Sequence, residues 1–137
     1  MFITQVPIEY INIIWPAISN YVDSATKYSR GRTDEGSVKE DCLKGNTILW
    51  IAHNEDHETF GFVTCQIITY PKIKSLDVQF TGGKKMTEWK SEMMNAIEIF
   101  AKRNNCSKIQ AIGRLGWAHF AEKYGFELNY YIYEKDI

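Results

Sequence analysis

The sequence contains few cysteines and no long apolar run, and its charges nearly balance. Its three cysteines, Cys42, Cys65 and Cys106, are odd in number and widely spaced, which argues against a disulfide framework and against a zinc site of the Cys-x-x-Cys type. Nowhere do about 18 apolar residues follow one another, so no segment is predicted to cross a membrane. These absences predict a soluble, unexported protein of a reducing cytoplasm, without membrane contact.

The charge and size of the chain limit its function classes further. Sixteen basic and 17 acidic side chains give a net charge of −1, which makes nucleic acid an improbable partner because no general field attracts a polyanion. The 137 residues, 45% of them hydrophobic, are enough for one compact core and too few for two ordinary domains. We therefore expect a single domain, residues 1–137.

The first third of the sequence predicts one strand followed by three helices. Residues 2–6 have the composition of a strand, and Pro7 then opens a helical apolar pattern. Proline suits the first turn of a helix and disrupts its interior, so Pro16 is expected to end this helix and start another, which stops before Gly31. A short third helix is expected at 37–44, where a Ser-Val-Lys-Glu start has capping-box spacing.

The remainder predicts an antiparallel meander and then alternating helices and strands. Three apolar runs between residues 47 and 80 are separated by polar clusters, and the last alternates, with Leu76, Val78 and Phe80 on one face. Thr81-Gly82-Gly83 is expected to break that strand. The later elements are a helix at 84–104, a strand at 108–112, a helix at 115–124 and a closing strand at 126–134. The long helix is expected to bury a stripe that consists of Met86, Trp89, Met93, Ile97 and Phe100.

This element order resembles that of GNAT N-acetyltransferases over nearly the whole chain. Three stretches carry a narrower similarity: LWIAHNEDHETFGFVTCQIITYP, LDVQFTGGKKMTEW and IGRLGWAHFAEKYGF resemble short GNAT-like proteins encoded by tailed bacteriophages. The resemblance implies an α/β (α+β) domain with the GNAT-like acyl-CoA N-acyltransferase fold, in which helices flank a central mixed, mostly antiparallel sheet.

The resemblance also implies a place for acetyl-CoA. In GNAT enzymes the turn before the long helix reads Gln or Arg, two residues, Gly, one residue, then Gly or Ala, and its backbone N–H groups cradle the pyrophosphate at the helix end. The corresponding residues, which form our candidate cofactor site, are Gln79, Thr81, Gly82, Gly83 and Lys84. Lys84 stands where a small residue is expected, although its ammonium could partly replace the cradle as a phosphate contact. A Gly-Gly turn that needs positive φ would explain the pair equally well.

Two groups that the family uses are missing. A Tyr that protonates the leaving thiolate would fall on Ala121, and an Asn that helps to hold the cofactor would fall on Arg114. Tyr124 lies nearby, but its spacing from Trp117 and Phe120 favours a buried helix face. No catalytic residue is therefore assigned, although Asp77 or Gln66 are candidates for a general base.

Other reactive side chains have simpler explanations. His53 and His57 flank a polar cluster that a hairpin loop explains, so no metal site is predicted. Cys65 lies among apolar neighbours and is expected to be a buried hydrophobe rather than a nucleophile. In a closing strand, Tyr131 and Tyr133 would face away from Tyr130; an exposed pair would suggest a protein partner.

Two functions follow from the resemblance and its gaps. The first is a catalytically degenerate GNAT-fold accessory protein of a tailed phage, which needs no cofactor and acts through contacts with a phage structural or host protein. It would work in the host cytoplasm or as a virion or assembly component. The alternative is an active N-acetyltransferase that uses acetyl-CoA to modify a host protein or a small amine. The missing residues favour the first over an enzyme.

Overall fold

A five-stranded sheet forms the centre of the chain. The computed structural model describes residues 1–113 and 117–137. The strand order is β1-β2-β3-β4-β5, and every neighbouring pair is antiparallel except β4 and β5, which are parallel. The strands are β1 (Phe2–Gln5), β2 (Ile48–His53), β3 (Thr59–Thr69), β4 (Lys74–Gly83) and β5 (Lys108–Ala111). The predicted mixed, mostly antiparallel sheet flanked by helices is confirmed.

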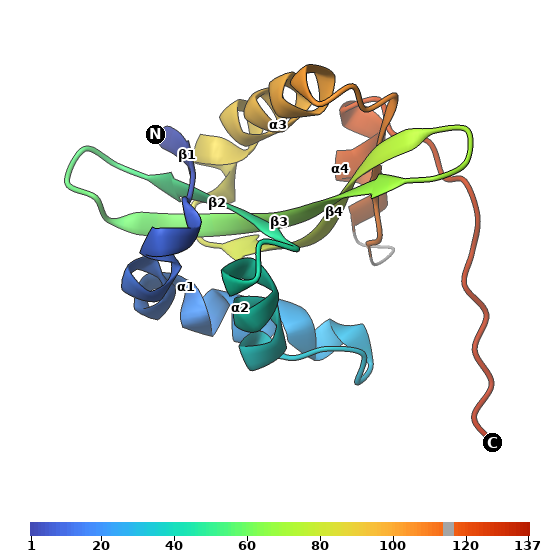
Figure 1. The fold of residues 1–137 in the computed structure, drawn as a ribbon, viewed down its shortest axis with the longest axis horizontal. Coiled ribbons are helices and arrows are strands. Elements are labelled where there is room, and N and C mark those ends of the chain that lie inside the picture. The colour runs from blue at the N-terminus through green and yellow to red at the C-terminus, as the bar shows by residue number, and fades with distance from the viewer. Residues whose placement is uncertain (114–116) are drawn as a thin grey trace.

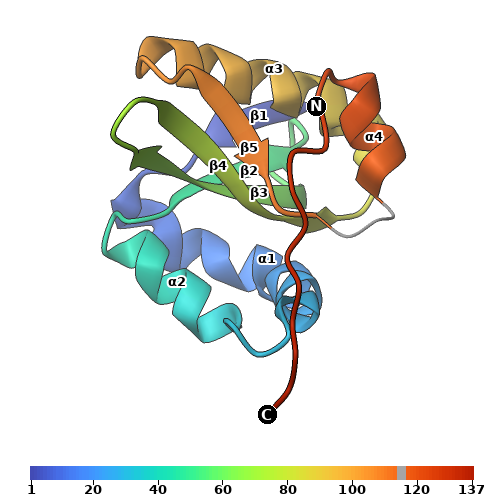
Figure 2. The same cartoon turned by 90° about the vertical axis from the view of Figure 1, so that its right-hand side faces the viewer.

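Helices cover both faces of this sheet (Figures 1 and 2). One face carries α1 (Ile11–Thr26) and α2 (Glu35–Leu43), together with the short 3₁₀ turns η1 (Ile8–Tyr10) and η2 (Lys27–Ser29). The other face carries α3 (Met86–Arg103), with α4 (Ala118–Lys123) near one of its ends. None of the described helices combines the length and apolar character that crossing a membrane requires.

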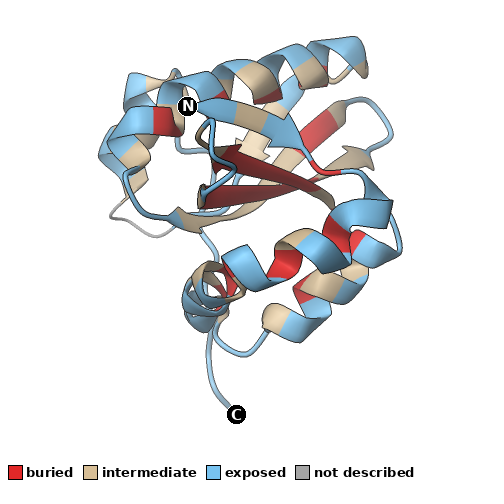
Figure 3. Cartoon of the chain, turned by 90° about the vertical axis from the view of Figure 1, so that its left-hand side faces the viewer, coloured by how far each residue is buried: buried red, intermediate tan, exposed pale blue. Residues whose placement is uncertain are grey.

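The sheet separates two apolar cores, and buried residues line the inner faces of sheet and helices (Figure 3). On the α1 side, Phe62 and Leu49 pack against Trp15 and Val22 of α1. On the α3 side, the predicted stripe of the long helix packs against the sheet: Trp89, Met93 and Ile97 are buried, and Met86 and Phe100 are half-buried. Burial on both faces fixes the register of the central strands, because a one-residue slip would exchange the two sets of side chains.

The prediction that Pro16 separates two helices was wrong. Pro16 is exposed inside one continuous helix, α1, whose buried positions Ile11, Trp15, Ile18 and Val22 keep one helical stripe through the proline. A proline removes one backbone hydrogen bond and crowds the preceding turn. Burial of a stripe that runs on both sides of Pro16 therefore outweighs that local cost.

The start of α2 also differs from the expected capping box. The helix spans Glu35–Leu43 rather than 37–44, and its N-cap is Asp34, whose carboxylate accepts a hydrogen bond from the Ser37 backbone N–H at 2.8 Å. Aspartate is as good an N-cap as serine. The helix also receives a tie to α1, because Trp15 Nε1 and Ser19 Oγ both donate to the Glu35 carboxylate.

The predicted closing strand at 126–134 was wrong. The chain there has no regular structure and no sheet partner among the described residues, and it runs past β5 and beyond the α1–α2 layer (Figure 2). Alternating apolar residues favour a strand only where a neighbouring strand is available to pair with them. Glu134 instead forms ion pairs with Arg30 and Arg32, each at 3.3 Å. The predicted helix start at Leu115 lies outside the described residues, and α4 is described from Ala118.

Candidate functional site

Strands β4 and β5 form a fork in the sheet. Strand β4 pairs with β3 along its whole length, from Lys74 to Gly83, but with β5 only from Ser75 to Val78. From Gln79 to Gly83, no described strand lies on the outer side of β4. An exposed strand edge presents unpaired backbone groups, so this stretch can receive an extended ligand that hydrogen-bonds to the main chain.

A β-bulge marks the point where the fork opens. Val78 pairs with Cys65 and Phe80 pairs with Thr64, which leaves Gln79 as an extra residue in β4. Such a residue stands outside the regular ladder and bends the strand. The Phe80 backbone N–H donates to the Thr64 hydroxyl at 3.2 Å. Gln79 therefore places an irregular backbone at the inner end of the fork.

The bulge overturns the predicted alternation of β4. Leu76 and Val78 pack in the core on the α3 side, whereas Phe80 packs against the core on the α1 side. A single inserted residue shifts the two-residue period by one, so every side chain after Gln79 points to the opposite face. The sequence could not reveal this, because Leu76, Val78 and Phe80 still alternate in the printed order.

Thr81, Gly82 and Gly83 belong to β4 instead of breaking it. Gly83 has φ +130°, and a Cβ there would lie 2.2 Å from the Phe60 carbonyl oxygen. A Cβ on Gly82 would lie 2.9 Å from the Phe62 ring. Both glycines are therefore required by the close packing of β4 on its own neighbours, whether or not a ligand is bound.

Two lysines follow at the start of α3. Lys84 Nζ and Lys85 Nζ lie 5.6 and 4.9 Å from the centre of the Phe60 ring, so both ammonium groups are attracted to the same aromatic side chain. Lys85 is the N-cap in a left-handed conformation, φ 55°, and its side chain makes no capping hydrogen bond. Lys85 is not among the predicted cofactor residues, because only its backbone geometry identifies it as the cap.

Hydrogen bonds to other residues of the chain hold the turn that contains these lysines. The Lys84 backbone N–H donates to the Phe60 carbonyl at 2.7 Å, so this N–H is not free to cradle a phosphate. The Lys84 carbonyl accepts from Trp89 Nε1 at 2.9 Å. An anion would instead meet the positive end of α3 and two ammonium groups, with Glu88 in the first turn as an opposing charge. The phosphate part of acetyl-CoA fits this arrangement of charge.

Helix α4 offers no acid at the expected position. Ala121 has no ionisable group, and Arg114 lies outside the described residues. The Tyr124 hydroxyl is 2.8 Å from Ser91 Oγ on α3, and its ring lies 4.8 Å from that of Phe120. The predicted packing face of α4 exists, but its members are half-buried rather than buried. The Tyr124 hydroxyl therefore helps to join α4 to α3.

Asp77 lies one residue before the last β4–β5 pair and is the only carboxylate in β4. It is half-buried and accepts from Ser75 Oγ and from Gln110 Nε2, both at 2.8 Å. Gln66, the other predicted base, donates to Thr47 Oγ1 at 3.0 Å. Asp77 is thus a fixed negative charge next to the fork, whereas the Gln66 amide has no basic group to offer.

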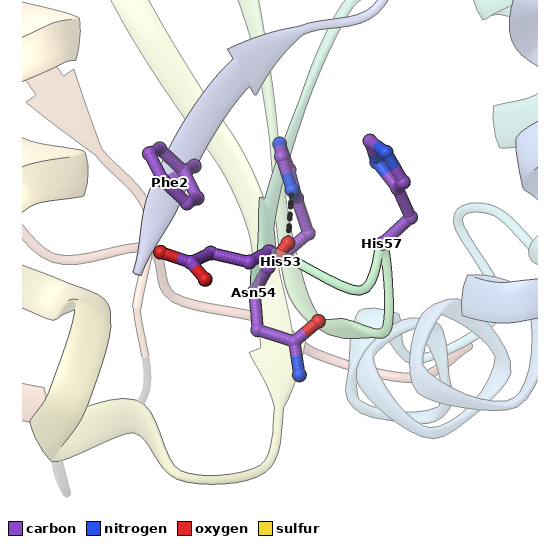
Figure 4. Close-up of a pocket in the computed structure, with 5 residues that line it drawn as sticks. Phe2, His53, Asn54 and His57 are labelled. Carbon is purple, nitrogen blue, oxygen red and sulfur yellow. Dashed lines mark hydrogen bonds between the residues drawn. The ribbon is translucent and has the colours of Figure 1, made fainter.

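The two histidines lie in and beside the β2–β3 turn, at the same end of the sheet as Gly83, because His53 pairs with Thr59 and Gly61 pairs with Gly83. Strand β3 lies between β2 and the fork. His53 stacks on Phe2 and on His57 (Figure 4), and its Nε2 is 2.8 Å from Thr4 Oγ1 while its Nδ1 is 3.0 Å from the Asn54 carbonyl. Hydrogen bonds engage both ring nitrogens, so neither is a ready metal ligand. In the described ranges no three His, Cys, Asp or Glu side chains are grouped to hold a metal ion.

The buried cysteines are inert. Burial raises the pKa of the Cys65 thiol to about 11, although Trp50 Nε1 donates to its sulfur at 3.3 Å. Burial likewise raises the pKa of Cys42 to about 12. A thiol that stays protonated at neutral pH is a poor nucleophile. The prediction that Cys65 is a buried hydrophobe is confirmed.

Comparison with known proteins identifies the fold. No family model and no curated protein matches the sequence. Among solved structures, a protein described as a probable acetyltransferase superposes with a TM-score of 0.76 at 10% identity, over 100% of this chain and 98% of the other. A ribosomal-protein-alanine N-acetyltransferase from Brucella melitensis biovar Abortus 2308 gives 0.73 at 12% identity, over 100% of both chains.

A third similar structure names the fold family. It is a GNAT family acetyltransferase from Staphylococcus aureus subsp. aureus USA300_TCH1516, with a TM-score of 0.68 at 14% identity over 99% of this chain and 98% of that one. Identities this low establish architecture and leave chemistry to the residues of the site. With its five-stranded mixed sheet, forked between parallel β4 and β5, the chain has the GNAT acetyltransferase fold.

Proposed function

We propose that the chain binds acetyl-CoA along the open edge of β4 and transfers the acetyl group to an amine. The observation that carries this proposal is the fork: an unpaired strand edge at Gln79–Gly83 leads directly to a basic helix end. The similarity of the fold to named acetyltransferases supports the same function. The acceptor is a host protein or a small amine, as the sequence resemblance implies.

The phosphates would be held at the start of α3. Lys84 and Lys85 place two exposed positive charges beside the helix end, where the helix dipole also favours an anion. Phe60 orients both lysines, so less side-chain freedom is lost when a phosphate binds. The two ammonium groups and the helix end would take the place of the backbone N–H groups that cradle the pyrophosphate in GNAT enzymes. Because these are charge–charge interactions, we expect the binding of acetyl-CoA to weaken as the salt concentration rises.

The reaction would take place at the inner end of the fork. Bound acetyl-CoA would supply an acetyl thioester, whose acyl carbon an amine attacks with loss of the thiol. The irregular backbone at Gln79 can orient a carbonyl group through main-chain hydrogen bonds. Asp77 provides a negative charge that attracts the ammonium form of the acceptor and can accept its proton.

The absence of a hydroxyl at Ala121 sets the expected rate. General acid catalysis contributes about 10²–10⁴-fold, whereas orientation of the reactants contributes more. We therefore expect transfer that is slow for an acetyltransferase, with the sulfur taking its proton from water. Substitution Ala121→Tyr would raise the turnover number if its new hydroxyl reaches the sulfur.

The binding step is tested with two charge reversals. Isothermal titration calorimetry with acetyl-CoA would compare the natural chain with the double variant Lys84→Glu/Lys85→Glu. We expect saturable binding that weakens at least about tenfold, or ~1.4 kcal/mol, in the variant. The control is Lys102→Glu/Arg103→Glu, the same change in charge at the other end of α3, which should bind normally. Equal binding by both variants would refute the lysine site.

A second candidate is a catalytically degenerate accessory protein of a tailed phage that acts through protein contacts in the particle or its assembly. It is favoured by Ala121, which supplies no acid, and by Tyr124, whose hydroxyl is already joined to Ser91. Calorimetry without any saturable acetyl-CoA signal would support this function over the first. Release of free thiol from acetyl-CoA in the presence of an amine would exclude it.

A further inference from the structure

An open cavity of about 310 Å³ lies at the end of the sheet where β1 meets the turn between β2 and β3. Its walls include the rings of Phe2, His53 and His57. The ring centres of Phe2 and His53 are 5.7 Å apart and those of His53 and His57 are 5.9 Å apart, with angles of 25° and 24° between the ring planes (Figure 4). The three rings therefore form one stack of nearly parallel planes.

The two outer members of this stack are exposed. Phe2 is 50% exposed, and His57 is exposed as well. Hydrogen bonds to Thr4 and Asn54 engage both nitrogens of the middle ring, His53, and hold it in position. Aromatic faces attract cations and planar groups. A planar ligand can therefore continue the stack by lying on an outer ring.

The β2–β3 turn holds His57 beside the stack before any ligand binds. His57 has φ 62°, which is uncommon for a residue other than glycine. The Asn54 side-chain oxygen accepts from the backbone N–H groups of Asp56 and Glu58 at 3.0 and 2.9 Å, and the Asn54 carbonyl accepts from the His57 N–H at 3.2 Å. Because these bonds order the turn, a ligand loses less of its binding free energy to ordering the protein.

The charge beside the rings is negative. Glu55 lines the cavity, and none of the described residues that line it is a lysine or an arginine. Among the described residues the Glu55 carboxylate has no ion-pair partner. Residues 53–58 contain three carboxylates and neither lysine nor arginine. A cation is therefore the ligand that complements this cavity.

The cavity and the lysines of the candidate cofactor site belong to opposite faces of the sheet. Lys84 and Lys85 lie near the ring of Phe60, which packs in the core on the α3 side. Ile3 packs against that same core, so its neighbour Phe2 points to the other face. A ligand in this cavity would therefore not occupy the place proposed for the phosphates of acetyl-CoA.

We propose that the cavity binds a guanidinium group, stacked on the aromatic rings and paired with Glu55. A guanidinium is planar, so it can continue a stack of parallel planes, and its N–H groups can bind both oxygens of one carboxylate. An ammonium is compact and strongly hydrated and matches only the charge. The guanidinium belongs to a small molecule or to an arginine side chain of another protein. This site is separate from the proposed acetyl transfer.

NMR titration with N-acetylarginine amide, whose only charge is the guanidinium, tests the site through the ring signals of Phe2 and His57. We expect saturable shifts, and at least about fivefold weaker binding of N-acetylcitrulline amide, which is uncharged. Glu55→Gln and Phe2→Leu should each raise the dissociation constant at least about fivefold. Asp56→Asn is the matched control: it removes the same charge from the same turn, but Asp56 does not line the cavity. Its dissociation constant should change less than about twofold.

Methylguanidinium distinguishes the two sources of the group. Binding as tight as that of the amide supports a small guanidinium compound, and weaker binding supports an arginine within a protein. Absence of saturable shifts in the natural chain overturns the proposal. Equal binding of the citrulline amide also overturns it. So does an equal loss in Glu55→Gln and Asp56→Asn, since only the general negative field would then attract the probe.

Discussion

Gly83→Ala should destabilise the chain even when no ligand is present. The new Cβ would lie 2.2 Å from the Phe60 carbonyl oxygen and 2.4 Å from the Gly61 Cα, both of them backbone atoms of β3 that cannot move without disturbing the sheet. The φ of +130° costs an L-residue about 1–2 kcal/mol, and forcing the strands apart adds about 1–3 kcal/mol. We expect a loss of about 2–5 kcal/mol in the free energy of unfolding.

Gly31→Ala is the matched control. Gly31 also has positive φ, +83°, but a Cβ there meets nothing within 4 Å, so only the backbone cost of about 1–2 kcal/mol remains. Urea unfolding followed by circular dichroism, without acetyl-CoA, would measure both variants. If the two lose the same free energy, the glycine is not required by the packing of β4 on β3, and a role limited to ligand approach would stand in its place.

Three further predictions concern buried and capping groups. Thr64→Val should lower the free energy of unfolding by about 1–3 kcal/mol in a urea titration, because the Phe80 N–H at the bulge loses its acceptor; an unchanged midpoint would contradict that role. Cys65 should resist a thiol-labelling reagent at neutral pH, since burial raises its pKa to about 11, while the half-buried Cys106 reacts first; mass spectrometry that finds Cys65 labelled first would be contrary. Asp34→Ala should remove stability that is present at neutral pH and lost as pH falls through the lowered pKa of the Asp34 carboxyl, so thermal unfolding of the two proteins should converge in acid.

Much of the fold could be predicted because a long segment with a regular spacing of apolar residues is compatible with only one type of secondary structure. The 3.6-residue stripe of Trp89, Met93 and Ile97 predicts α3 and its buried face, and both are found. Predictions from neighbouring residues alone were wrong where contacts with residues far along the chain determine the structure. Pro16 is tolerated because the stripe of α1 is buried on both sides of it, and residues 126–134 form no strand because alternation does not supply a neighbour.

Less of the candidate site could be predicted. The motif predicted a cofactor site at Gln79, Gly82 and Lys84, which lie beside an open strand edge and a helix end. It could not assign Gly82 to the strand, because the contact that requires a glycine there comes from Phe62, twenty residues earlier in the chain. The bulge at Gln79 was equally hidden, since it depends on the pairing of β4 with β3.

The change of face within β4 has a consequence for how the chain unfolds. Before the bulge the strand gives Leu76 and Val78 to one core, and after it gives Phe80 to the other. Loss of either core therefore removes side-chain contacts that hold the middle of β4 in place. The two cores should lose their structure together, in one cooperative transition, and the amides at the centre of β4 should exchange with solvent only when the whole domain opens.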